Sequence, residues 1–343
     1  MSLRFLFAAI AAALLLPGSF FTLNAAPLRV LYFTKSSAFE HSVIKRTDGQ
    51  PSYSERILAR LGTEHDFTCT FSKDGSLFSK DYLSAFDVIV FYTSGDLFST
   101  GTDGQPPMTA EGKAALLDAI AGGKGFVGLH SCSDSFHTGE SGGGMREERG
   151  QRFKNYGEAS DPFIKMLGGE FIRHGPQQQA VTRVTSPHFP GFEKLGAEFT
   201  THEEWYSLKD FAHDLHVLLI LETNGMKGGD YARPPFPVAW VRVHGQGRVA
   251  YNAMGHREDV WDSAAYQSML IGAINWAGKR ASADPAPNLE TTAPGHTTLP
   301  PFEKLRNSSR RAAQPPRASS SAQSSPMRAA VVTATSAASI RPC

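Results

Sequence analysis

The sequence predicts an α/β fold with a doubly wound, mostly parallel sheet. First, strand-like apolar runs alternate with segments of helical periodicity between residues 28 and 130, which is the pattern of βαβ units. Second, the stretch 125–138, GFVGLHSCSDSFHT, begins as a buried strand and ends abruptly in small polar residues. Open α/β sheets bind ligands at this carboxyl edge. Third, 343 residues with 41% hydrophobic side chains are enough for one large domain or two small ones.

The first half of the chain has the clearest elements. Residues 51–61 predict a helix capped by Ser52 or Ser54, and a second helix begins at Thr109. Glycines 122, 123 and 125 mark the turn before the strand at 126–130. The strands expected in this half cover residues 28–34, 66–71, 86–92 and 126–130.

The second half is less regular. Residues 140–157 are rich in glycine and charge without periodicity, so we expect an exposed loop there. A short helix at 161–167 is closed by Gly168-Gly169, and residues 263–276 predict the last helix. Residues 181–185, 199–208 and 217–222 predict strands, and 238–243 and 248–253 predict a hairpin that turns at 245–247.

The two ends of the chain differ from the middle. Arg4, the apolar run 5–16, the break at Pro17-Gly18 and the small residues Ala25-Ala26 predict a signal peptide over 1–26. This run is short for a membrane span, which needs about 20 residues. We therefore expect a periplasmic or secreted protein with no membrane span in its mature form, the alternative being an uncleaved anchor. Residues 281–343, rich in Ala, Ser, Pro, Thr and Arg, predict a disordered tail after a domain at 27–280.

Charge and motif content exclude several classes of function. The chain has 34 Lys+Arg against 33 Asp+Glu, which gives no basic footprint for a nucleic acid. The phosphate-binding motif GxxxxGK[ST] does not occur, and we expect no nucleotide cofactor. The three cysteines form no disulfide pattern, and only Cys132 is placed where it would react if a base lay beside it.

Histidines follow several of the expected strands. His41, His130 and His256 each come after a strand end, so the sheet would bring them to one edge. Within 200–206, a period of two puts His202, Glu204 and Tyr206 on one face and Glu203 and Trp205 on the other. Imidazoles with carboxylates suit a divalent metal such as zinc and equally suit proton transfer. No tight HExxH spacing decides between them, and we leave the role of His174 open.

Several short motifs occur in one order along the chain. They are Phe39-Glu40-His41-Ser42, Gly128-Leu129-His130-Ser131, His202-Glu203-Glu204-Trp205-Tyr206, 237–240 with Gly247-Arg248-Val249, and Gly255-His256. Through them the chain resembles the ThuA-like (trehalose utilisation) family over residues 28–279. The resemblance implies a flavodoxin-like fold similar to class I glutamine amidotransferases, a three-layer sandwich. It also implies a role in carbohydrate catabolism, on a disaccharide or a keto-sugar.

The resemblance also bears on the type of chemistry. In amidotransferases the nucleophilic cysteine lies in a Gly-x-Cys-x-Gly turn, whereas here His130 takes that position and Cys132 lies two residues further on. We therefore expect no glutamine amidotransferase activity, because an imidazole is better suited to binding a metal or moving a proton.

Our leading hypothesis is an exported hydrolase or isomerase/lyase that acts on a sugar. Asp134 would orient His130 or cap a helix, and Trp205 or Tyr206 would stack on the sugar ring or pack in the core. The expected catalytic residues are His130, Glu204 and His256, the expected substrate-binding residues are His41, Trp205, Tyr206 and Asp134, and the expected metal ligands are His130, His202 and His41.

Two other functions remain open at this point. One is a non-catalytic carbohydrate-binding module, which would bind sugar without turnover. The other is a Cys132-dependent hydrolase, which the Cys132→Ser variant would test. The sequence leaves the oligomeric state open, including a homo-oligomer.

Overall fold

The computed structural model describes residues 26–136 and 160–301. The expected signal peptide up to residue 25, the expected loop at 140–157 and the last part of the expected tail, 302–343, lie outside the described residues. Among the described helices, none combines the length and the apolar composition that crossing a membrane requires.

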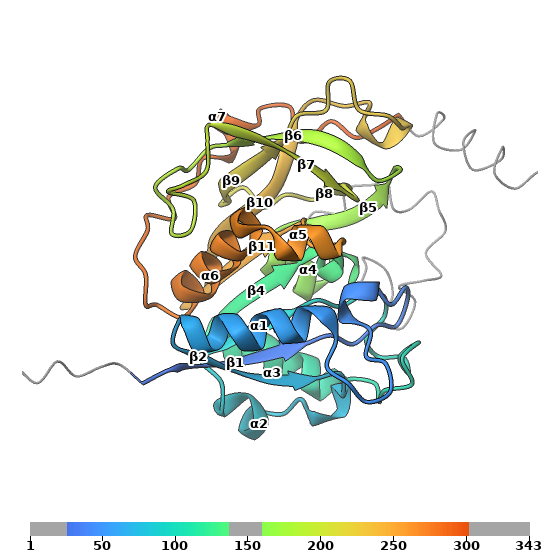
Figure 1. Cartoon of the computed structure of the whole chain (residues 1–343), viewed down its shortest axis with the longest axis vertical. Coiled ribbons are helices and arrows are strands. Elements are labelled where there is room, and N and C mark those ends of the chain that lie inside the picture. Colours follow the sequence, from blue (N-terminus) through green and yellow to red (C-terminus); the bar gives the residue numbers. More distant parts are fainter. Residues whose placement is uncertain (1–25, 137–159, 302–343) are drawn as a thin grey trace, which may run out of the picture.

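A nine-stranded mixed sheet forms the centre of the molecule (Figure 1). Its first five strands run parallel in the order β2-β1-β3-β4-β11, the order of flavodoxin-like sheets. These are β2 (Phe67–Ser72), β1 (Leu28–Phe33), β3 (Val88–Phe91), β4 (Gly125–Leu129) and β11 (Gly247–Asn252). Strands β3 and β4 are buried along their whole length, which explains their continuous apolar sequences.

The second half of the sheet is antiparallel. It continues from β11 through β10 (Phe236–His244), β9 (His216–Leu221), β6 (Gln178–Val184) and β7 (Glu198–Glu203). Strands β10 and β11 form the expected hairpin, which turns at Gly245 with a φ of +61°. A separate two-stranded sheet pairs β5 (Glu170–His174) with β8 (Tyr206–Lys209).

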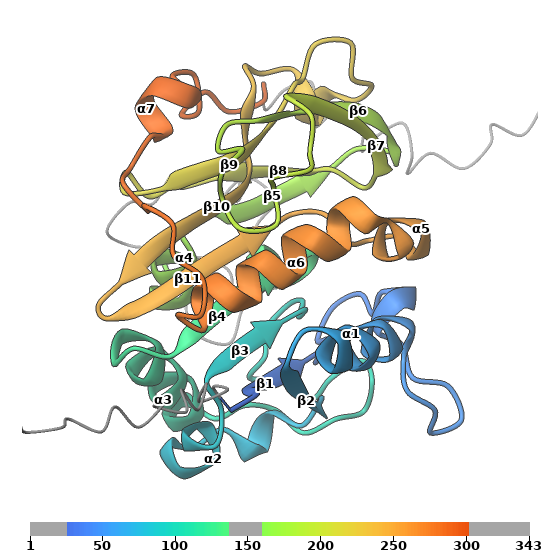
Figure 2. The ribbon, with the colours of Figure 1, turned by 60° about the vertical axis from the view of Figure 1, so that its left-hand side comes forward.

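The helices form two contiguous groups. One consists of α1 (Tyr53–Glu64), α5 (Glu258–Asp262) and α6 (Ala264–Ala277), which lie in front of the sheet in Figure 1 and side by side in Figure 2. The other consists of α2 (Lys80–Ser84), α3 (Ala110–Ala121) and α4 (Pro162–Leu167). Helix α1 starts with a capping box in which Ser52 and Glu55 satisfy each other's backbone N–H groups.

The α/β class and the large sheet are confirmed, and three expectations need correction. The first correction is that the sheet is parallel only in its first half; the arrangement in three layers stays a prediction. The expected strand 199–208 is two strands, β7 and β8, which belong to different sheets because the chain turns at Glu204 and Trp205. Strand β5 was not expected.

The third correction concerns the tail. Residues 281–301, expected to be disordered, pack on the domain and include helix α7 (Leu289–Thr292). Leu289 and His296 are buried, and the Asn288 side chain accepts a hydrogen bond from the backbone N–H of Val217 at 2.6 Å. Composition failed here because a few contacts with a folded surface order a segment that has no core of its own.

Candidate functional site

His130 lies at the sharp turn where β4 ends. Its φ is +41°, a left-handed conformation that is costly for a residue with a Cβ atom. His130 is the first of the five residues of a short 3₁₀ helix, η3 (His130–Asp134), and its side chain is fully buried. Two residues earlier, a Cβ atom on Gly128 would lie 2.9 Å from Leu167 and 3.0 Å from Cys132. The turn is therefore tightly packed and holds the imidazole in one place.

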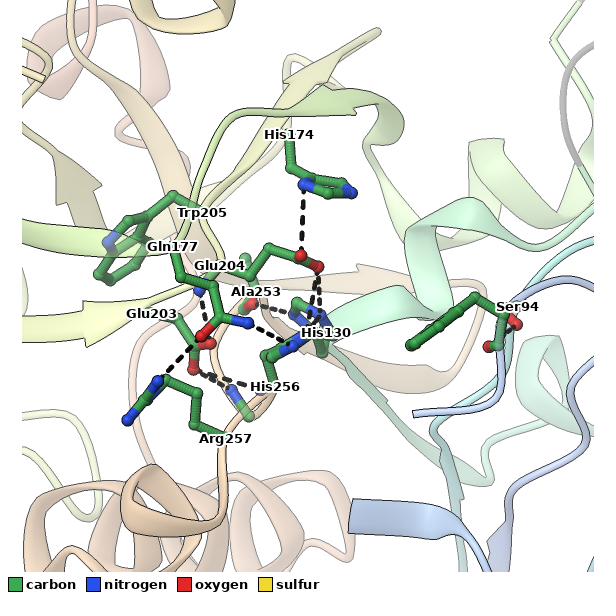
Figure 3. A network of polar contacts seen from close by, with 12 residues as sticks. Ser94, His130, His174, Gln177, Glu203, Glu204, Trp205, Ala253, His256 and Arg257 are labelled. Atoms are coloured by element: carbon green, nitrogen blue, oxygen red, sulfur yellow. Dashed lines mark hydrogen bonds and ion pairs between the residues drawn. The ribbon is translucent and has the colours of Figure 1, made fainter. Parts of the chain in front are cut away.

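Three other side chains meet His130 at the carboxyl edge of the sheet. His41 follows β1 and precedes the 3₁₀ helix η1 (Ser42–Ile44), Glu204 follows β7, and His256 follows β11. Each of the four residues offers one nitrogen or oxygen atom, and these atoms all lie within 4.8 Å of one another. We call these four residues, His41, His130, Glu204 and His256, the His/Glu cluster. Figure 3 shows the polar contacts that join three of them, His130, Glu204 and His256.

The Glu204 carboxylate connects the imidazoles of this cluster. Its Oε2 lies 3.0 Å from Nδ1 of His256 and 3.6 Å from Nε2 of His130. Its Oε1 lies 3.3 Å from Nδ1 of His174, whose side chain is partly exposed at the end of β5. The nitrogens of His130 and His256 that face Glu204 lie 3.2 Å apart.

The outer partners of two histidines determine which ring nitrogen carries the proton. Nδ1 of His130 lies 2.8 Å from the carbonyl oxygen of Ala253. A carbonyl only accepts, so Nδ1 donates, and in the neutral ring Nε2 turns a lone pair toward the cluster. Arg257 donates from Nη1 to Oε1 of Gln177, which leaves the Gln177 amide to donate to Nε2 of His256 at 2.9 Å. Neutral His256 therefore carries its proton on Nδ1, toward Glu204 (Figure 3).

Glu203 positions the loop that carries His256. Its side chain is fully buried; Oε1 accepts the N–H of Glu204, and Oε2 accepts the N–H groups of Gly255 and His256 at 2.8 and 3.2 Å. Burial raises the pKa of Glu203, against the influence of His130 and these backbone donors. Sequence reasoning placed Glu203 on the face away from the site. In the sequence, the feature that could have indicated a role for Glu203 is its position directly beside the second acidic residue, Glu204.

The environment sets the charge of the cluster. Burial opposes ionisation of Glu204, but the imidazoles of His130 and His256, which donate to the carboxylate when they are protonated, outweigh it and hold the pKa of this carboxyl well below its usual range. Burial lowers the pKa of His256, and the hydrogen bond with Glu204 more than reverses this, so the net shift is upward. Burial, together with repulsion from His130 and His256, lowers the pKa of His41 well below 6.5 and keeps His41 neutral near pH 7.

Several expected site residues lie elsewhere. His202, an expected metal ligand, is exposed on β7 and is not part of the His/Glu cluster. The alternation of β7 ends at Glu203, and the next residue, Glu204, turns into the cluster. Trp205 is fully buried and donates its indole N–H to Gln178, so it has no free face for a sugar. Tyr206 is buried, and its ring centroid lies 4.2 Å from that of His130.

The orienting role expected for Asp134 belongs to a backbone group. Asp134 lies at the end of η3, and the Nδ1 atom of His130 is held by the Ala253 carbonyl while Nε2 faces Glu204 and His256. Both ring nitrogens of His130 are thus engaged by other groups. Besides Glu203, the site residues that the sequence analysis missed or left open are Gln177, Ala253, Arg257 and His174.

Cys132 is placed unfavourably for nucleophilic chemistry. Its side chain is fully buried in η3, and burial raises the pKa of the thiol, against weaker hydrogen bonds from Thr93 and Leu129. A thiol that stays protonated and inaccessible is a poor nucleophile. The structure therefore argues against the Cys132-dependent hydrolase.

The His/Glu cluster fits a divalent metal. Three imidazoles and one carboxylate are typical zinc donors, and tetrahedral zinc with bonds of about 2.0–2.1 Å places its ligand atoms about 3.4 Å apart. The cluster atoms, within 4.8 Å of one another, need only small side-chain movements to reach that spacing. Nδ1 of His41 is buried without a hydrogen-bond partner, and His130 donates its outer N–H to a carbonyl, as ligating histidines do.

The fold and the site define an α/β protein with a buried His/Glu cluster at the carboxyl edge of a mixed sheet. A family model described as trehalose utilisation (ThuA) matches residues 29–277, and the chain belongs to this family. A ThuA-like protein from Bacteroides uniformis has a similar structure, with a TM-score of 0.52, 20% identity and coverage of 74% of this chain and 92% of that one. For a ThuA-like protein from Parabacteroides merdae the TM-score is 0.49, with 14% identity and coverage of 80% and 96%. No curated protein sequence gives a match.

Proposed function

We propose that this protein is an exported enzyme of carbohydrate catabolism that acts on a disaccharide or a keto-sugar through the His/Glu cluster, assisted by a divalent metal such as zinc. The observation that carries the proposal is the meeting of four donor atoms, from His41, His130, Glu204 and His256, within 4.8 Å. The family description, trehalose utilisation, supports a carbohydrate as the substrate. The apolar segment at residues 5–16 supports export.

Three of the four residues are suited to hold the metal. His41 is kept neutral by burial, His130 turns the lone pair of Nε2 inward, and Glu204 is kept ionised by its imidazole neighbours. Two imidazoles and one carboxylate form the ligand set of many catalytic zinc sites, in which a fourth position remains open for water or substrate. When bound, a divalent metal would polarise a sugar oxygen or lower the pKa of a water molecule.

His256 is suited to move the proton. The Gln177 amide donates to Nε2 of His256, so the transferable proton of the neutral ring is on Nδ1, inside the site. Glu204 raises the pKa of His256 above its ordinary value, which favours the protonated ring that a general acid requires. An imidazole of this kind donates a proton to a leaving oxygen in hydrolysis, or shuttles it between carbon and oxygen in an isomerisation.

Metal content of the full chain tests this proposal. We would measure it in the wild type, His130→Ala, Glu204→Gln and a matched control, His202→Ala, whose exposed imidazole lies two residues from Glu204. We expect about one metal per chain in the wild type and the control, and loss in the other two variants. Turnover of disaccharides, trehalose included, and of their keto derivatives would be measured with and without added zinc.

Two results would overturn the proposal. If His130→Ala retained as much metal as the wild type, the His/Glu cluster would not be the metal site. If the metal-loaded wild type turned over none of the disaccharides or keto-sugars, the carbohydrate reaction would be wrong. Sugar binding without turnover would instead support the non-catalytic carbohydrate-binding module.

A further inference from the structure

Phe39 is an exposed aromatic side chain in the loop that leads to His41. Its exposed fraction is 66%, against 42% for Leu77 and 44% for Val243, the other large apolar side chains that are exposed among the described residues. Isolated apolar side chains on a surface are ordinary and imply nothing by themselves. Phe39 differs in two respects: its backbone is fixed by contacts on both sides, and its ring contacts His41 of the His/Glu cluster.

The backbone around Phe39 is fixed on both sides. The Ser94 hydroxyl, after β3, donates to the carbonyl oxygen of Phe39 at 2.9 Å. The next residue, Glu40, pairs with the buried Lys73 at 3.0 Å. On the other side, Gly95 has a φ of +77°, and a Cβ atom there would lie 2.9 Å from Ala38. The loop is therefore pressed against the end of β3, and the Phe39 ring is presented to solvent in a defined place.

The Phe39 ring contacts the ring of His41, a member of the His/Glu cluster. Its centroid lies 5.0 Å from that of His41, in an edge-to-face arrangement. The His41 ring in turn lies 4.9 Å from His130 and 5.0 Å from His256. Two exposed polar side chains contact the cluster from outside: His174, at the end of β5, and Gln177, directly before β6.

An exposed aromatic ring next to clustered hydrogen-bonding groups matches the chemistry of a sugar ring. A pyranose has a face of C–H groups, which an aromatic ring attracts, and a rim of hydroxyls, which imidazole, amide and carboxylate groups bind. We propose that Phe39 is the platform on which a pyranose ring of the substrate stacks, so that its hydroxyls face the His/Glu cluster. This inference rests on the proposed function and narrows the substrate to cyclic pyranosides. Trp205 and Tyr206, the two aromatic residues that the sequence suggested for stacking on the sugar, are buried and do not offer a ring to it.

The test measures sugar binding by the full chain and compares Phe39→Ala with Phe39→Tyr and with a matched control, Leu77→Ala. The probes are trehalose, methyl α-D-glucopyranoside and the open-chain polyol sorbitol, each titrated by saturation-transfer difference NMR. We expect Phe39→Ala to weaken pyranoside binding roughly five- to tenfold, and Phe39→Tyr and Leu77→Ala to bind within about twofold of the wild type. Sorbitol should bind more weakly than the pyranosides and be insensitive to all three changes.

Metal content, measured in parallel, separates failure of this inference from failure of the proposed function. Phe39→Ala should keep the metal content of the wild type, because Phe39 contributes no donor atom to the cluster. If the wild type binds pyranosides and Phe39→Ala binds them equally well, the stacking role is wrong and the proposed function stands. If the wild type binds none of the sugars, the carbohydrate function fails and the stacking role with it.

Discussion

The Nδ1 atom of His256 lies 3.0 Å from Oε2 of Glu204, and this contact joins the end of β11 to the end of β7. It lowers the pKa of the carboxyl and raises the pKa of the imidazole. The two residues therefore carry opposite charges over a wider pH range than either would alone.

The stability of the metal-free protein should depend on pH through this pair. The contribution of Glu204, whose pKa is lowered, is present above its ordinary value of 4.5 and is lost as the pH falls through the folded-state pKa. The contribution of His256, whose pKa is raised, is present below 6.5 and is lost as the pH rises through the folded-state pKa. Glu204→Gln should therefore be destabilised by about 1–3 kcal/mol, most strongly between these two values.

Chemical denaturation in the presence of EDTA, at pH values from about 4 to 9, checks this prediction. The difference in unfolding free energy between wild type and Glu204→Gln should shrink as the pH rises beyond the folded-state pKa of His256. A difference that stays constant across this range would show that the ion pair contributes nothing that depends on pH.

Gln177 should control the proton position on His256. The Gln177→Leu variant removes the donor to Nε2, so the proton of the neutral imidazole would no longer be confined to Nδ1. We expect turnover to fall about 10–100-fold, with metal content unchanged. Gln179→Leu, an exposed glutamine on β6, is the matched control and should behave as the wild type. Nitrogen-15 NMR of the histidine rings reads the tautomer directly; an unchanged His256 signal in Gln177→Leu would contradict the assignment.

Glu203 should act as a positioning residue through the backbone of His256. In Glu203→Gln, an amide N–H₂ would face one of the N–H groups of Glu204, Gly255 or His256 that the carboxylate now satisfies. We expect a loss of about 1–3 kcal/mol in unfolding free energy and weaker metal binding. Glu198→Gln, exposed on the same strand, is the control. Equal stability and metal affinity in both variants would show that Glu203 has no such role.

Cys132 should be dispensable for chemistry. Cys132→Ser should keep its turnover within about threefold of the wild type, with a modest loss of stability because a hydroxyl replaces a buried sulfur. Peptide mapping after iodoacetamide treatment should find Cys132 unmodified in the folded protein, since the thiol is buried and its pKa is raised. Rapid alkylation of Cys132 that abolishes turnover would restore the thiol-dependent mechanism.

The fold class and part of the site followed from the sequence because they depend on local pattern. Strands β1, β3 and β4 are apolar runs bounded by turn residues, and such runs are buried wherever they occur in a parallel sheet. The position of His130 directly after β4 was visible for the same reason. Parallel strands end at one edge, so the meeting of His130 with His41 and His256 could also be expected.

Other parts of the site depended on where the chain leaves a regular element. The period of two predicted that His202 and Glu204 share a face, but β7 ends at Glu203, and the turn there sends Glu204 into the cluster while His202 remains exposed. The periodicity of a sequence does not show at which residue a strand ends, because the end of a strand depends on the neighbouring strands and loops with which it pairs. The same holds for residues 281–301, which are ordered by packing on a surface that the rest of the chain provides.

The sequence by itself thus determined the α/β class, the family and the three histidines at the strand ends. Only the tertiary structure decided which carboxylate joins them, which ring nitrogen of His130 and of His256 carries the proton, and which aromatic side chain is exposed to solvent. The physical reason is that burial patterns are local and repeat along the chain. The contacts of His130 with Ala253 and of His256 with Gln177 instead join residues 123 and 79 positions apart.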